Sequence, residues 1–437
     1  MQSVEMIPFG LLAGFIDEKE VRITEISTES FCFRVRVPVK TPEHIRISFY
    51  DFSEATYQEV ELTAYGIREE KQERYFVSYR ITVAQKEYVQ AVQKLFREYT
   101  GYIRARLEGT DGEMAQVICN YPADQDAIHA QSMEEQKSIW FSHAQIRPEV
   151  QGMEIALELD RNTWYDLYEQ NPIEKFAGQY WKENGIGGWE QHKTIPDRLY
   201  IGNAFCHLLF PQEEQLFALM DKANVENVEI TLVFPWMREF QVEERGKLLK
   251  KVDNWCEKQH TKVEILVNDW GMATLVKECG KHLEPCLGVL LNKQKKDPRM
   301  RYKKGSIRGL GENNLQADFY RTFLKETYGI NRYEWESCGY LQAFPRGKNS
   351  LHLPYYQTNT SQYCPLYASC TEGERGKQRL PESCPGYCEQ YAYLYPKHLH
   401  MAGRYNSLFG LDEELIKHPE RLKTYQQAGI DRLVIGL

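Results

Sequence analysis

The sequence lacks any stretch that is long and apolar enough to span a bilayer. Its apolar run from Met6 to Ile16 is too short, and no basic residues precede that run as they do in a secretory signal. We therefore expect a cytoplasmic protein that has no membrane partner. Thiols stay reduced in the cytoplasm, so the eleven cysteines of the chain need an explanation other than disulfide bonds.

Motifs for phosphate binding and for hydrolysis are also missing. There is no Walker loop, and Gly309–Gly311 supplies only the first pair of glycines of a Gly-x-Gly-x-x-Gly fingerprint. No HExxH and no Ser/His/Asp or Cys/His arrangement supports proteolysis. The net charge of −8 argues against a broad nucleic-acid-binding face. The basic run Lys293–Lys304 is a local exception, interpreted either as a solvated loop or as a grip for phosphate or RNA.

A chain of 437 residues predicts two domains, and the pattern of segments divides it accordingly. Residues 1–105 contain short β-branched and aromatic segments separated by turn or charged residues, which predicts a small antiparallel β-barrel. The helix Lys86–Tyr99 is expected to pack on this barrel, because its apolar residues recur at helical spacing. In residues 106–150 the periodicity weakens, which indicates a connector. The expected strands are Val21–Ile26, Phe31–Val39, His44–Tyr50, Glu59–Ile67 and Arg74–Thr82.

Residues 151–437 alternate strand-like and helix-like segments, which is typical of parallel βαβ units. About eight strands over this length predict an α/β fold with a TIM-like (β/α) barrel. The chain ends on a strand-like segment, which leaves the closure of the barrel open. The expected strands are Glu154–Leu159, Asp197–Gly202, Val228–Pro235, Val263–Asp269, Cys286–Leu291, Tyr333–Tyr340, Leu351–Tyr356 and Asp431–Leu437. The expected helices include Glu213–Ala223, Val242–Lys258, Met272–Lys281, Asn314–Tyr328 and Pro419–Ala428.

Four of the eleven cysteines fall within 25 residues, with the spacing Cys364-x5-Cys370-x13-Cys384-x3-Cys388. Close spacing lowers the entropic cost of gathering soft thiolate ligands around one metal. Four unrelated buried thiols are the weaker interpretation, because a charged loop rarely places cysteine in an apolar core. Zinc favours C-x2-C pairs, which are absent, whereas iron–sulfur clusters accept wider spacings. On spacing alone, zinc and iron–sulfur are about equally favoured.

Cys206 is a candidate for a further ligand, although a buried core thiol is the usual interpretation of a lone cysteine. It follows the expected strand Asp197–Gly202, and the loops after the strands of a barrel converge on one face. The segment Leu351–Tyr356 is expected to deliver Cys364 and Cys370 to the same face. The residues expected to face the site are Asn203–Cys206, Pro235–Trp236, Asn268–Asp269, Asn292–Lys293 and Gln357–Thr360.

Polar residues at these strand ends are candidates for a substrate pocket, namely Asn203, Asn268 and Asp269. Asp269 is the candidate catalytic residue. Its carboxylate either accepts a proton or orients a substrate, or it caps the helix that begins near Gly271. Three histidines could serve as ligands but are better interpreted as surface or satisfied core residues, namely His352, His398 and His400.

Together, these motifs resemble peptidase family U thirty-two, the collagenase-like protease family. The matching stretches are RLYIGNAFC at 198–206, VNDWG at 267–271 and SCTEGERGKQRLPESCPGYC at 369–388. The cysteine segment is most similar to the iron–sulfur members of the family that act in ubiquinone biosynthesis. The resemblance covers about residues 150–437. It implies a [4Fe–4S] cluster on Cys206, Cys370, Cys384 and Cys388, with Cys364 as a neighbour or an alternative ligand.

The same resemblance implies oxygen-independent hydroxylation or another redox modification of a small molecule or an RNA base. It also implies a possible partner protein of the same family. Two other interpretations stay open. One is a non-enzymatic regulatory or scaffold protein whose cysteines hold structural zinc. The other is a peptidase, which is supported by the family name alone.

The N-terminal strands and their closing helix resemble a PilZ domain. PilZ domains that bind cyclic di-GMP use an Arg-x3-Arg arm and an Asp/Asn-x-Ser-x2-Gly turn. The corresponding turn here, Glu25–Ser30, keeps only the serine Ser27, and no arginine pair precedes it. The forked guanidinium contacts that a dinucleotide needs are therefore missing. We expect a degenerate PilZ-like module for docking or regulation that does not bind cyclic di-GMP.

Overall fold

The computed structural model describes residues 4–5, 11–17, 19–51, 56–108, 130–141, 152–184, 195–296, 311–373, 377–394 and 400–436. Described residues up to Glu108 form one compact unit, and those from Ala130 onward form a second. The division falls inside the expected connector of residues 106–150. The helix α3 (Ala130–Phe141) lies in that connector, and its Trp140 and Phe141 are buried in the core of the second unit.

The first unit is an antiparallel sheet with one helix packed on it. The strands run in the order β6-β5-β2-β3-β4-β8-β7, and β1 pairs with β3. Within the described residues no pairing joins β6 to β7, at the two ends of this order. The helix α1 (Lys86–Glu108) places Tyr88, Val92 and Leu95 in the core. The strands are β1 (Val4–Glu5), β2 (Leu12–Ile16), β3 (Lys19–Ile26), β4 (Ser30–Val35), β5 (Ile45–Asp51), β6 (Thr56–Glu61), β7 (Tyr65–Gln72) and β8 (Val77–Val83).

The second unit is a closed barrel of eight parallel strands that follow one another in chain order. The strands are β9 (Glu154–Leu159), β10 (Arg198–Gly202), β11 (Glu229–Val233), β12 (Val263–Val267), β13 (Leu283–Leu287), β14 (Arg332–Glu336), β15 (Lys348–Thr360) and β19 (Arg432–Gly436). The last strand pairs in parallel with the first, and Glu154 lies opposite Arg432. The C-terminal strand-like segment therefore closes the barrel, the point that the sequence left open.

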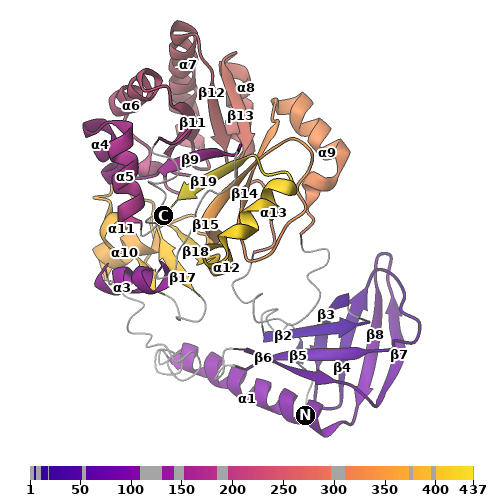
Figure 1. Ribbon diagram of the computed structural model, residues 1–437. Helices are drawn as coiled ribbons and strands as arrows, with labels where there is room; N and C mark the ends of the chain where they lie inside the picture. Colours follow the sequence, from indigo (N-terminus) through magenta and orange to yellow (C-terminus); the bar gives the residue numbers. More distant parts are fainter. Residues whose placement is uncertain are drawn as a thin grey trace. The chain divides into compact units, whose positions relative to one another are not determined.

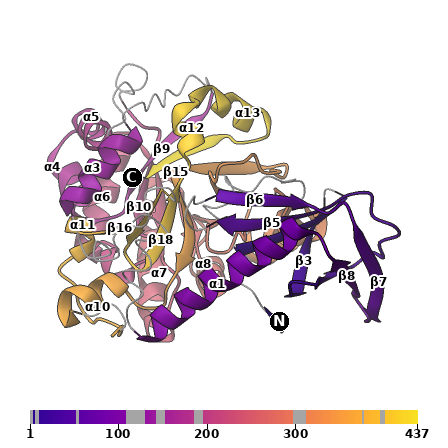
Figure 2. The same ribbon diagram turned by 90° about the horizontal axis from the view of Figure 1, so that it is seen from below.

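Helices cover the outside of this barrel (Figures 1 and 2). They are α4 (Asn162–Gln170), α5 (Ile173–Glu183), α6 (Glu213–Val225), α7 (Val242–Gln259), α8 (Trp270–Cys279) and α9 (Asp318–Phe323), with short turns η4 (His207–Leu209), η5 (Glu239–Gln241), η7 (Asn314–Gln316) and η8 (Leu324–Tyr328). Their apolar faces bury a continuous core against the strands, with Trp164 of α4 centred 4.7 Å from Tyr180 of α5. Among the described helices, none combines the length and the apolar character needed to cross a membrane.

Between β15 and β19 the chain makes an excursion that carries the cysteine segment. β15 extends beyond the barrel and pairs antiparallel with β18 (Ser407–Leu411), which pairs with β17 (Met401–Arg404) and, through it, with β16 (Tyr393–Leu394). The helices of the excursion are α10 (Pro365–Glu372), α11 (Tyr387–Gln390), α12 (Glu413–Lys417), η10 (Pro419–Arg421) and α13 (Leu422–Gln427). Because β15 leaves the barrel at its C-terminal end and pairs there with β18, the excursion lies beside the barrel mouth.

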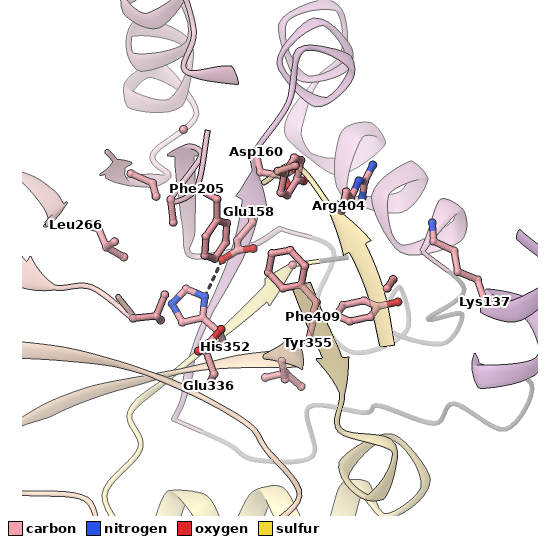
Figure 3. A pocket seen from close by; sticks show the side chains of 18 residues that line it. Lys137, Glu158, Asp160, Phe205, Leu266, Glu336, His352, Tyr355, Arg404 and Phe409 are labelled. Carbon is pink, nitrogen blue, oxygen red and sulfur yellow. Dashed lines mark hydrogen bonds and ion pairs between the residues drawn. The ribbon is translucent and has the colours of Figure 1, made fainter. Parts of the chain in front are cut away.

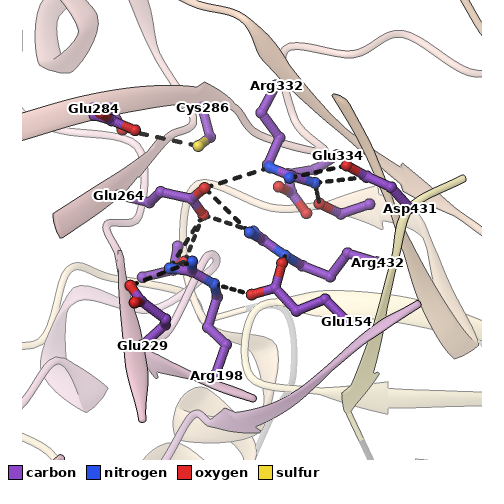
Figure 4. Close-up of polar contacts among 12 residues, drawn as sticks. Glu154, Arg198, Glu229, Glu264, Glu284, Cys286, Arg332, Glu334, Asp431 and Arg432 are labelled. Atoms are coloured by element: carbon purple, nitrogen blue, oxygen red, sulfur yellow. Dashed lines mark hydrogen bonds and ion pairs between the residues drawn. The ribbon is translucent and has the colours of Figure 1, made fainter. Parts of the chain in front are cut away.

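The N-terminal half of the barrel interior is filled by charged side chains (Figure 4). Arg432 on β19 pairs with Glu264 on β12 and with Glu154 on β9. Arg198 and Arg332 also pair with Glu264, at 3.5 and 3.4 Å. This half of the interior therefore holds an ionic network, because each of these arginines meets a carboxylate from another strand.

Candidate functional site

Four cysteines line one enclosed cavity beside the barrel mouth, namely Cys206, Cys364, Cys384 and Cys388. Cys206 lies in the loop after β10, whereas the other three belong to the excursion after β15. Cys364 is the N-cap of α10, and Cys388 lies in α11. The structure thus brings together residues from loops that the sequence expected on one face.

Cys370 does not line this cavity. It lies on α10, six positions after Cys364, a spacing that turns two side chains to different faces of a helix. Burial and the nearby Cys384 raise the pKa of Cys370, so its thiol lies near the cysteines that line the cavity. The cavity therefore holds Cys364, the alternative ligand, where the family resemblance implies Cys370.

Cys388 is buried and the other three cysteines of the cavity are half-buried. In three of the four, burial favours the protonated thiol. Burial raises the pKa of Cys206 to about 12 and that of Cys364 to about 11, and it raises the pKa of Cys388 further. A bound metal reverses this preference, since thiolates are the ligands and binding releases their protons. Among the described residues, no three His, Cys, Asp or Glu side chains converge closely enough to hold one metal ion.

Asn203 positions the loop that carries Cys206. Its side-chain oxygen accepts the backbone N–H groups of Phe205 and Cys206, both at 2.8 Å, and its amide donates to the carbonyl of Asp160 at 2.9 Å. The side chain is almost fully buried, with 1% exposed. All of these bonds are to the backbone, so Asn203 sets the shape of the loop between the cysteine cavity and the barrel mouth.

Asn268 and Asp269 border a wide polar groove at the barrel mouth. Trp236, Asn292, Lys293 and the segment 357–360 line the same groove, as expected from their positions after the strands. Asp269 is the N-cap of α8: one carboxylate oxygen accepts the N–H of Met272 at 2.8 Å, and the other accepts that of Met237 at 2.7 Å. Asn268 donates to the carbonyl of Phe234 at 2.8 Å. Both residues hold the backbone in place.

A second, mostly apolar pocket opens at the centre of the barrel mouth (Figure 3). Phe205 and Phe409 meet edge to face with ring centroids 5.0 Å apart, and Tyr405 lies parallel to Phe205 at 6.4 Å. Tyr405 lines both this barrel-mouth pocket and the cysteine cavity, and its hydroxyl donates to Asp160. Arg404, the preceding residue, donates to the carbonyl of Cys388 at 2.9 Å. The two cavities are therefore neighbours that share a wall.

Tyr405 occupies an unusual backbone conformation at the turn between β17 and β18. Its φ is +58°, in the left-handed region that a bulky residue seldom adopts. Such a conformation costs about 1 kcal/mol or more and persists only where surrounding contacts enforce it. The turn thereby directs the ring of Tyr405 between the two cavities.

His352 lines the barrel-mouth pocket, where Figure 3 shows its contact with Glu158, and a second carboxylate, Glu334, lies on the other side of the ring. Its Nδ1 is 2.7 Å from Glu158 Oε1, and its Nε2 is 2.8 Å from Glu334 Oε2. Burial alone would lower the pKa of His352, but hydrogen bonds to the two carboxylates outweigh burial and raise it to about 10. The histidine is satisfied, as the sequence suggested, yet it also lines the pocket.

Two other sequence candidates have different surroundings. His400 pairs with Glu413 at 2.8 Å. His398 and the part of the basic run from Asp297 onward lie outside the described residues. Lys296, at the start of that run, pairs with Glu336 at the barrel mouth.

Comparison with known proteins gives no family for this chain. No family model and no curated protein matches it. Among solved structures, an uncharacterized protein of Legionella aligns with 24% of this chain and 99% of its own length, at 11% identity and a TM-score of 0.18. A similarity this low shows neither a shared fold nor a shared function.

Proposed function

We propose that this protein binds an iron–sulfur cluster of the [4Fe–4S] type at the cysteine cavity and modifies a substrate in the neighbouring barrel-mouth pocket. One observation carries the proposal: four thiols from separate segments line a cavity that shares Tyr405 with that pocket. A thiolate-ligated cluster supplies electrons to a bound partner. We infer a redox modification, such as the oxygen-independent hydroxylation of a small molecule or an RNA base.

The residues around the thiols suit an anionic group. Cys206, Cys384 and Cys388 would be ligands, with Cys364 completing the set. Arg404 is buried beside Cys388, and its positive charge would offset the negative charge of a thiolate-bound cluster. On the substrate side, the apolar walls of the barrel-mouth pocket exclude water, and Asp160 fixes the hydroxyl of Tyr405.

Structural zinc is the alternative to a cluster. A zinc ion binds each thiolate at about 2.3 Å, which requires its ligands to converge on one point. A four-iron cluster is larger and holds its ligands farther apart. We favour the cluster because the C-x2-C pairs that zinc prefers are absent from the sequence and because the cysteine segment resembles iron–sulfur proteins. A peptidase has no residues in the sequence to support it, and a U thirty-two relationship remains our proposal from the motifs alone.

For the first unit we propose a docking or regulatory role, similar to that of a PilZ domain but without cyclic di-GMP. In support, Ser27 closes the turn between β3 and β4, where its hydroxyl accepts the N–H of Ser30 at 3.0 Å. Ser27 also joins the helix to the sheet, because the hydroxyl of Tyr88 in α1 donates to the backbone carbonyl of Ser27 at 2.7 Å. Isothermal titration with cyclic di-GMP should give no heat, and saturable binding would contradict this proposal.

Anaerobic purification tests the cluster directly. We expect a brown protein with broad absorbance near ~400 nm, as thiolate-ligated clusters show, with iron and sulfide in equal amounts. Cys388→Ser should remove the colour, whereas Cys279→Ser, in α8 and away from the cavity, should retain it. A colourless protein that contains stoichiometric zinc after anaerobic reconstitution would overturn the proposal.

A further inference from the structure

We infer that Glu158 and His352 form an acid–base pair that exchanges a proton with a substrate in the barrel-mouth pocket. The two side chains come from strands on different parts of the barrel, β9 and β15, and meet at 2.7 Å. Both line the pocket at the C-terminal ends of the strands, where chemistry occurs in barrels of this type. This inference rests on the proposed function only in assuming that the pocket binds the substrate, and it needs no cluster.

The imidazole and the two carboxylates beside it differ in their access to the pocket. The Glu158 side chain is 28% exposed, that of His352 is 13% exposed, and that of Glu334 is 0% exposed. Glu334 is held in turn by the hydroxyl of Tyr200, which lies 3.2 and 3.3 Å from its two oxygens. A fixed inner carboxylate orients the imidazole, and the outer carboxylate meets the substrate. In enzymes that pair a nucleophile with a general base, a third group likewise orients the base.

The last barrel strand makes room for the outer carboxylate. A Cβ atom at Gly436 of β19 would lie 1.8 Å from Glu158 Oε2, so a side chain there would displace the carboxylate from its present place. His352 contacts the other oxygen, Oε1. Oε2 therefore occupies the space that a side chain at position 436 would take.

The charges around His352 determine which proton moves. Glu158 and Glu334 face its two nitrogens, and the Tyr200 ring meets the imidazole edge to face at 5.7 Å. With the raised pKa of His352, the pair carries one transferable proton at neutral pH. On protonating a substrate, Nδ1 of His352 gives its proton to Glu158, and Glu158 gives one to the substrate atom. The products are a neutral imidazole, a carboxylate and a protonated substrate, and the reverse transfer restores the pair.

The pocket indicates the class of substrate that would use this pair. Its walls are mainly apolar and aromatic, and they include Phe205, Leu266, Tyr355 and Phe409. The two lysine and arginine side chains that line it already interact within the protein, since Arg404 donates to the carbonyl of Cys388 and Lys137 also has a partner. We therefore infer an uncharged substrate with an apolar body and one polar atom that gains or loses a proton.

4-Nitrophenol is a suitable probe, because its ring is apolar and its absorbance distinguishes the phenol from the phenolate. The carboxylates disfavour a bound phenolate, so the apparent pKa of the phenol should rise by about one pH unit or more in the full-length protein. Glu158→Gln should abolish most of that rise. Glu284→Gln, at the opposite end of the barrel, should leave it unchanged. An equal apparent pKa with the wild type and with Glu158→Gln would overturn the inference.

A second measurement does not depend on the probe. In protein with 15N-labelled histidine, both ring nitrogens of His352 should carry protons at pH 8, with the signal assigned by its loss in His352→Asn. A neutral imidazole at pH 7 would also overturn the inference. Iron is measured in the same samples. Missing iron with an intact nitrophenol shift overturns only the cluster, whereas bound iron without the shift overturns only the acid–base pair.

Discussion

The guanidinium of Arg432 donates to both carboxylate oxygens of Glu264 inside the barrel, at 2.6 and 3.1 Å. It also donates to Glu154 at 2.7 Å and to the hydroxyl of Tyr200 at 2.8 Å. One side chain thus connects four strands, β19, β12, β9 and β10. Because the planar guanidinium offers several donors in fixed directions, a lysine at this position would satisfy fewer of these groups.

Arg432→Met should destabilise the protein strongly. The substitution keeps an apolar stem of similar length but removes the cation that binds both oxygens of Glu264 and one of the two arginines that pair with Glu154. Breaking a buried ion pair in this way costs about 3–5 kcal/mol. Urea unfolding measures the change, and Lys247→Ala, which breaks the exposed pair with Glu243, should leave the free energy of unfolding almost unchanged. A loss for Arg432→Met as small as that of the control would contradict the prediction.

His352 should make stability depend on pH above neutrality. Its pKa is raised in the folded protein from 6.5 to about 10, so folding is favoured by its protonated form. That stabilisation is fully present below pH 6.5 and is lost as the pH rises through 10. The difference in unfolding free energy between the wild type and His352→Gln should therefore shrink between pH 7 and 10. Urea titrations at intervals across this range would test it, and a constant difference would speak against a protonated His352.

Cysteine substitutions should distinguish Cys364 from Cys370 as a ligand. Because Cys364 lines the cavity and Cys370 does not, Cys364→Ser should lower the iron content after anaerobic reconstitution as much as Cys206→Ser does. Cys370→Ser should retain most of the iron. Iron and sulfide analysis, together with the visible spectrum, provides the measurement. Retention of iron in Cys364→Ser and its loss in Cys370→Ser would restore the ligand set that the family resemblance implies.

Two glycines of the second unit should respond to alanine in opposite ways. Gly202 ends β10 with a φ of +122°, and a Cβ there would lie 2.2 Å from the carbonyl oxygen of Val233. Gly202→Ala should cost about 3 kcal/mol or more, since neither backbone can move without disturbing the barrel. Gly178, in α5, has open space within 4 Å of the place that a Cβ would take, so Gly178→Ala should stabilise the protein by about 0.5–1 kcal/mol. Thermal and urea unfolding would reveal the contrast.

Most barrel strands could be predicted from the sequence because their apolar runs are short and bounded by turn residues. The strand β9 has the predicted bounds, Glu154–Leu159. The sequence predicts another strand at Cys286–Leu291, but the corresponding strand, β13, spans Leu283–Leu287. The apolar run LGVLL is misleading, because Gly288 begins a turn in which a Cβ would lie 2.7 Å from the carbonyl oxygen of Val267. In the first unit, Glu59–Ile67 proves to be parts of two strands, β6 and β7.

Three of the cysteines that line the cavity stand out because they are close together in the sequence, and Cys206 stands out because it follows a barrel strand. The pair Glu158–His352 could not be predicted, since its members lie 194 residues apart and meet only when the barrel closes. A signal was nevertheless present. Glu158 and His352 each lie between two leucines of their strands, and Glu334 lies between a tyrosine and a tryptophan. A charged residue between such neighbours must find a partner inside the barrel. The shared wall at Tyr405 left no trace in the sequence, because it depends on a backbone conformation.

The pairing of β9 with β19 bears on the order in which the protein folds. The contact between Glu154 and Arg432 joins residues 278 positions apart, so the entropy of a very long loop must be lost before that contact forms. Local strand–helix units can assemble earlier, whereas the ionic network waits for the final strand. We expect barrel closure to limit the folding rate, as is typical of parallel sheets with distant contacts. The arginine that connects four strands is then among the last residues to reach its place.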